Sequence, residues 1–166
     1  MLKVTIPEKN RRRVRVLDAL SILLLATALV PAIVVFPEWR EVRAAAAPEA
    51  DVLRDKFGII VFMWVLAAIA FALGSYLKAY GMGFNLPVRI PEKNTTAFRG
   101  LVVEMMSALV LIICAMFATV NFGFAYECED AALFVSAGLT ATLVVVCIVY
   151  TKRIYKLQNK TRGARR

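Results

Sequence analysis

The sequence predicts an all-α integral membrane protein with four transmembrane helices, built as two tandem copies of a two-helix hairpin. The 166 residues are 60% hydrophobic, with a mean hydropathy of +0.68, which is more apolar than a soluble domain. Four apolar runs are each long enough to cross a hydrocarbon core of about 30 Å. One heptapeptide also occurs twice, as VTIPEKN at 4–10 and VRIPEKN at 88–94, and such a repeat indicates duplicated units.

The four predicted spans cover residues 17–36, 57–76, 101–122 and 132–150 of a single membrane domain. Repeat one takes residues 1–83 and repeat two takes residues 84–166. We expect Asn10 to cap the first helix and Pro31 to kink it. Two copies in the same orientation predict a pseudo-two-fold axis along the membrane normal.

Charge along the chain predicts which side each loop occupies. Seventeen of the 21 lysines and arginines lie in 1–15, 77–99 and 151–166, whereas the other loops are acidic. Basic residues that flank membrane helices stay in the cytoplasm, so we expect both termini there, beside anionic lipid headgroups. The net charge of +9 does not indicate nucleic-acid binding, because the basic residues flank helix ends without interleaved aromatic platforms.

Two acids fall inside the predicted spans, and each precedes a serine by three residues. Asp18 and Ser21 form this pattern in the first span, and Glu104 and Ser107 form it in the third. Charges within membrane helices are candidate functional groups, so the four residues are a candidate ion, proton or lipid site. Structural pairing is the favoured interpretation, because both acids are expected in a first helical turn, close to headgroups and to Arg15 or Arg99.

The composition excludes several kinds of chemistry. The chain has no histidine, no metal-ligand spacing and no nucleophile beside a base, so we expect neither an enzyme nor a metal site nor a cofactor. The three cysteines, Cys114, Cys128 and Cys147, do not form a disulfide framework. We expect Cys128 to be a free thiol in an outer loop, with an intermolecular bridge as the alternative.

Residues 84–94, FNLPVRIPEKN, carry a resemblance to a known family. They resemble a bacterial four-helix membrane domain family of unknown function that also accompanies SdpI-type immunity proteins. The family's segment reads approximately FNYPVKITEEN, and its usual histidine stretch in the first outer loop is absent here. The resemblance implies a prokaryotic inner-membrane protein of the immunity or sequestering type, and it implies no reaction.

The leading functional hypothesis is therefore an accessory, immunity or sequestering protein that acts through a basic cytoplasmic face on lipid headgroups or a protein partner. A small transporter or channel subunit that uses Asp18 and Glu104, within a homodimer, is one alternative. A passive structural subunit of a membrane complex is another. The candidate interaction motif is the duplicated PEKN with the arginine that follows each copy: Pro7, Glu8, Lys9, Asn10, Arg15, Pro91, Glu92, Lys93, Asn94 and Arg99.

Overall fold

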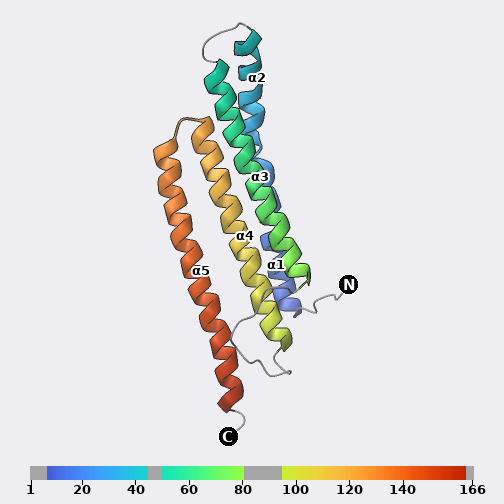
Figure 1. The fold of residues 1–166 in the computed structure, drawn as a ribbon. Coiled ribbons are helices and arrows are strands. Elements are labelled where there is room, and N and C mark those ends of the chain that lie inside the picture. Colours follow the sequence, from blue (N-terminus) through green and yellow to red (C-terminus); the bar gives the residue numbers. More distant parts are fainter. Residues whose placement is uncertain (1–6, 45–49, 81–94, 164–166) are drawn as a thin grey trace.

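The chain folds into long helices that run side by side (Figure 1). The structure, a computed structural model, describes residues 7–44, 50–80 and 95–163. In order, the helices are α1 (Glu8–Thr27), α2 (Val30–Ala44), α3 (Ala50–Tyr80), α4 (Thr95–Ala125) and α5 (Glu129–Gly163). Four helical stretches are long and apolar enough to cross a membrane, and the first of them, Glu8–Ala44, combines α1 and α2.

The predicted spans 57–76, 101–122 and 132–150 each lie inside one helix, whereas the span 17–36 is divided between α1 and α2, and the helices extend well beyond the apolar runs. Residues 37–44 belong to α2 rather than to an outer loop, and Lys78, expected in the middle loop, belongs to α3. Asn10 does not cap α1, because the helix begins at Glu8 after Pro7 and has no side-chain cap. The tandem-repeat relation and the orientation of the termini stay predictions.

The interruption of the first span follows from Pro31. Proline has no N–H, and its ring clashes with the carbonyl four residues earlier, which here belongs to Thr27, the last residue of α1. Two side chains then satisfy carbonyls that the break leaves without helical partners. The Trp64 indole donates to the Leu25 carbonyl at 2.9 Å, and the Asn121 amide donates to the Ala28 carbonyl at 3.2 Å. The break is therefore held from α3 and from α4.

Helix α4 lies at the centre of the arrangement. Helices α1, α3 and α5 each pack along it, whereas α1 and α3 make few direct contacts. Close approach of α4 to α3 and to α5 depends on glycine: a Cβ at Gly74 would lie 2.3 Å from the Val110 side chain, and one at Gly123 would lie 2.3 Å from the Ala132 Cβ. Small residues allow such contact between membrane helices.

The outer surface of the bundle is apolar. Exposed fractions reach 59% for Leu23, 69% for Ile33 and 84% for Phe134. Of the apolar 18-residue stretch of α5, only 6% is buried. Water would strongly disfavour so much exposed hydrocarbon. A lipid bilayer accommodates it, which agrees with the length of the four stretches.

Candidate functional site

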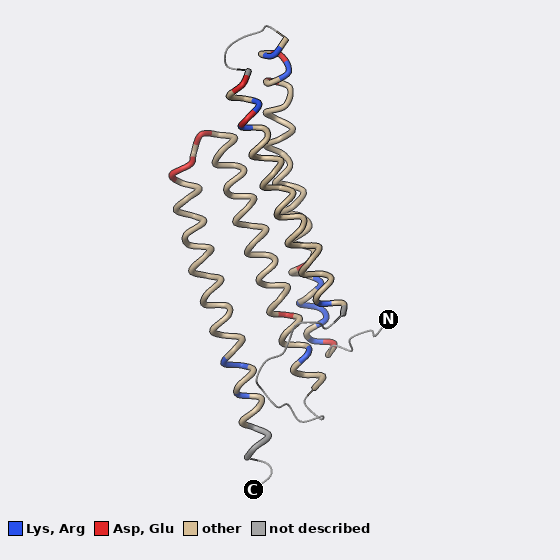
Figure 2. The backbone as a smooth tube through the Cα atoms, viewed as in Figure 1, with Lys and Arg blue, Asp and Glu red and all other residues tan. Residues whose placement is uncertain are grey.

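Lysines and arginines cluster at one end of the bundle, where α1 and α4 begin and α3 and α5 end. Figure 2 shows Lys and Arg residues at this end, residues of both charge signs where α2 ends and α3 begins, and acids at the turn between α4 and α5. We call the end where α1 and α4 begin the basic end. Two polar clusters lie there, one around Glu104 and one around Lys78.

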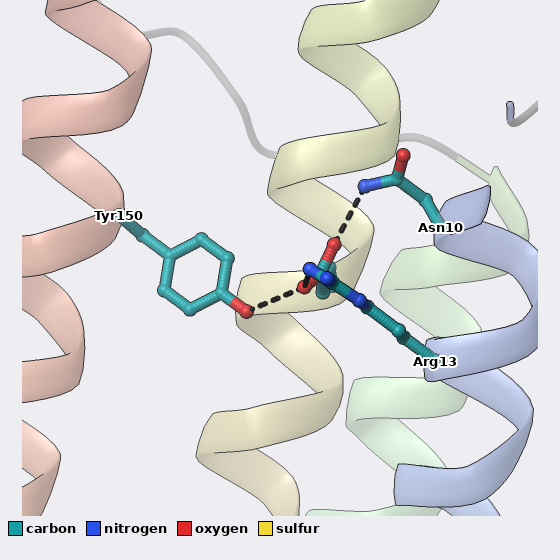
Figure 3. Close-up of polar contacts among 4 residues, drawn as sticks. Asn10, Arg13 and Tyr150 are labelled. Atoms are coloured by element: carbon teal, nitrogen blue, oxygen red, sulfur yellow. Dashed lines mark hydrogen bonds and ion pairs between the residues drawn. The ribbon is translucent and has the colours of Figure 1, made fainter.

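The Glu104 cluster joins three helices. Glu104, on α4, is 3% exposed and accepts a hydrogen bond at Oε2 from the Asn10 amide at 2.6 Å. Its Oε1 accepts from Arg13 Nη1 at 3.1 Å and from the Tyr150 hydroxyl at 3.0 Å. The three donors converge from α1 and α5 on the carboxylate (Figure 3). A buried carboxylate needs this kind of pairing, because an isolated one would be too costly to desolvate.

The Lys78 cluster joins α3 to the same two central helices. Lys78 is 8% exposed. Its ammonium group donates to Asp18 Oδ1 on α1 at 2.5 Å and to the Ser107 hydroxyl on α4 at 3.1 Å. Ser107 lies three residues after Glu104, on the same side of α4. The two clusters are therefore neighbours, and together they connect all four spans.

The structure brings some of the predicted site residues together and separates others. Asp18 and Ser107 meet through Lys78, while Glu104 lies in the adjacent cluster. Ser21 is buried, but its hydroxyl donates to the Leu17 carbonyl of its own helix. Both acids are paired within the protein, but the partners are Lys78 and Arg13 rather than Arg15 or Arg99, which are exposed.

Two residues of the first PEKN copy pack against α4, and the other two are exposed. A Cβ on Gly100 of α4 would lie 2.8 Å from Pro7 and 3.2 Å from the Asn10 side chain, so these two residues dock the start of α1 against α4. Glu8 and Lys9 are exposed. The second copy, with Pro91, Glu92, Lys93 and Asn94, lies outside the described residues.

An open cleft of about 860 Å³ borders the start of α1. The described residues that line it are mostly cationic: Glu8, Lys9, Arg11, Arg12, Arg13 and Arg15. Arg13 reaches Glu104 with one guanidinium nitrogen and keeps 53% of its side chain exposed. The other cations of the cleft form no ion pair with a described carboxylate.

Sequence reasoning missed Lys78 and Tyr150 as partners of the acids. A usable signal existed for Lys78, because no glycine or proline stands between the apolar run and Gly81, so the helix could be extended to include it. Cys114, Cys128 and Cys147 are all free thiols. Within the described ranges, no group of three or more His, Cys, Asp or Glu residues is placed to hold a metal ion.

Comparison with protein-family models, with curated proteins and with solved structures finds no match for this chain. The resemblance at residues 84–94 therefore stays a prediction, and it lies outside the described residues.

Proposed function

We propose that this chain is a membrane-embedded interaction protein, of the accessory, immunity or sequestering type, that binds an acidic protein partner at its basic end. The observation that carries the proposal is the length of α5. Tyr150 marks the level of Glu104, and α5 continues from there to Gly163, about 20 Å further at 1.5 Å per residue. Lys152, Arg153 and Lys156 are exposed on this continuation, which we call the α5 extension.

Pairing of the two intramembrane acids favours this function over transport. Asp18 bonds to Lys78 and Glu104 bonds to Arg13, so each negative charge is already balanced by a cation of the protein. A transported cation would have to displace one of these partners. Structural pairing is therefore the role we assign to the acids. A transporter or channel subunit is the alternative, and a measurement of ion flux tests it.

The proposal includes an orientation. We infer that the basic end faces the cytoplasm of a prokaryotic cell, with the protein in the plasma membrane, because positively charged flanks stay on that side. The α5 extension would then meet soluble proteins and the cytoplasmic parts of other membrane proteins. Its spaced cations suit acidic partners through charge complementarity.

Photo-crosslinking in the native membrane tests the proposal. A crosslinking amino acid in place of Tyr155, which is 49% exposed, should capture an acidic protein of defined mass. The double substitution Lys152→Glu/Lys156→Glu should reduce that capture at least fivefold. The matched control, Arg40→Glu/Arg43→Glu, reverses two exposed charges at the other end and should leave capture unchanged.

Capture that survives the α5 substitution, or no capture at all, would overturn the proposal. In that case, ion flux in proteoliposomes should be measured for the wild type and for Asp18→Asn/Glu104→Gln. Flux that disappears in the double variant would establish the transporter alternative instead.

A further inference from the structure

The first two turns of α1 hold a surplus of positive charge that the described protein does not balance. Lys9, Arg11, Arg12 and Arg15 lie there beside Arg13, which Glu104 neutralises. Cations are unfavourable at a helix N-terminus because of the macrodipole, and like charges four residues apart, such as Arg11 and Arg15, repel each other. An anion in the adjoining cleft would relieve both effects.

The size and composition of the cleft indicate a phosphate-bearing group. Its volume of about 860 Å³ exceeds what a single small ion occupies. Guanidinium groups provide planar, paired N–H donors that match phosphate oxygens, and their charge does not depend on pH in the physiological range. Arg11 and Arg12 are exposed and line the cleft.

The neighbouring surface of α1 distinguishes a lipid from a free phosphate. Val16, Leu20 and Leu23 are 53%, 43% and 59% exposed, and they follow Arg12 at intervals of four, four and three residues, which places all four on one face of the helix. This face therefore passes directly from a cation to an apolar stripe. It also belongs to the first candidate span, Glu8–Ala44.

We propose that the cleft at the start of α1 binds the phosphate of an anionic glycerophospholipid, with an acyl chain along Val16, Leu20 and Leu23. Arg11 and Arg12 hold the phosphate, and Lys9 and Arg15 add positive charge around it. The site is independent of the proposed protein partner, because that partner is assigned to the α5 extension. Either proposal can fail without the other.

Native mass spectrometry of the purified full chain, titrated with single lipids, tests the site. Phosphatidylglycerol should bind at least tenfold more tightly than phosphatidylcholine, which carries no net charge. Arg11→Gln/Arg12→Gln should remove most of this difference. Both residues are exposed, so the substitution should leave the fold intact, and a circular dichroism spectrum unchanged from the wild type verifies this.

The matched control removes two charges from the same end of the bundle but outside the cleft. Lys152→Gln/Lys156→Gln should change phosphatidylglycerol affinity less than twofold. An equal loss in this control, or no loss in Arg11→Gln/Arg12→Gln, would overturn the assignment of the site. Arg15→Gln provides a second cleft variant, expected to weaken binding by a smaller factor, and no weakening there would count against the cleft.

Water-soluble glycerol phosphate separates a lipid site from a phosphate site. It carries the same phosphate group without an acyl chain, and it should bind at least a hundredfold more weakly than phosphatidylglycerol. Binding of equal strength would refute the contribution of the apolar stripe and would assign the cleft to soluble phosphate compounds.

Discussion

At the scale of single residues, the most informative feature is that both intramembrane acids have partners from distant parts of the sequence. Asn10 and Arg13 precede Glu104 by 94 and 91 residues, and Lys78 follows Asp18 by 60. The acids themselves could be predicted, because each interrupts an apolar run. Their partners could not, because which of 21 cations reaches a given acid depends on how the helices pack.

Removal of the Lys78 ammonium group should lower the free energy of unfolding. Lys78→Met keeps an unbranched side chain, one atom shorter, but leaves Asp18 without its cation, and breaking a largely buried ion pair costs about 3 kcal/mol. Unfolding by graded addition of denaturing detergent measures this loss. Lys56→Met is the control on the same helix: its partner Glu127 is 85% exposed, so the expected cost is below about 0.5 kcal/mol.

If the pairing accounts for the loss, neutralising both partners should be milder than removing one. We expect Asp18→Asn/Lys78→Met to be more stable than Lys78→Met alone. A double variant that is less stable than either single variant would show that the two residues contribute independently.

The Tyr150 hydroxyl should contribute to holding α5 against the bundle. Tyr150→Phe keeps the ring and removes the hydrogen bond to Glu104, and we expect a loss of about 1 kcal/mol in the free energy of unfolding. Tyr126→Phe is the matched control, because Tyr126 is 52% exposed and its ring stacks on Phe122. Equal stability of the two variants would contradict a supporting role for the bond.

At the scale of elements, hydropathy located the spans but not the ends of the helices. Polar residues such as Lys78 continue a helix when no breaker intervenes, so α3 and α5 extend past their apolar runs. Pro31 was a sufficient signal for distortion of the first span. The two-residue turn between Thr27 and Val30 also receives donors from α3 and α4, and no local pattern reveals these partners.

Those donors should stabilise the break. Trp64→Phe removes the indole N–H that reaches the Leu25 carbonyl and leaves this carbonyl without that donor in an apolar environment, at an expected cost of about 1 kcal/mol. Asn121→Leu removes the donor to the Ala28 carbonyl and should cost a similar amount. Detergent unfolding measures both. Full stability in the two variants would show that the carbonyls need neither side chain.

At the scale of the whole molecule, composition and charge distribution predicted a membrane-spanning helical bundle, and the described residues contain four helical stretches that are long and apolar enough to cross a membrane. The central place of α4 could not be predicted. It depends on close contacts at Gly74 and Gly123 and on the convergence of donors on Glu104. The residues that make these contacts lie far apart in the sequence or on different helices, and they meet only when the helices pack.

Orientation can be tested with a native residue. Cys128 is exposed beside the turn between α4 and α5, whereas Cys114 is buried in α4 and Cys147 lies within the fourth candidate span. A membrane-impermeant maleimide added to intact cells should label the chain, and Cys128→Ser should abolish the label. Labelling that requires opened cells would reverse the proposed orientation.

The long sequence separation within the Glu104 cluster has a consequence for biogenesis. A ribosome adds about 5–20 residues per second, so roughly 5–20 s pass between synthesis of Asn10 or Arg13 and synthesis of Glu104. During that interval the first span must enter the membrane with Arg13 still lacking its carboxylate. Arg13 keeps 53% of its side chain exposed even in the folded chain, so water or lipid headgroups can solvate its charge during this interval. The buried Glu104, in contrast, is made only when Asn10 and Arg13 are already in place to pair with it.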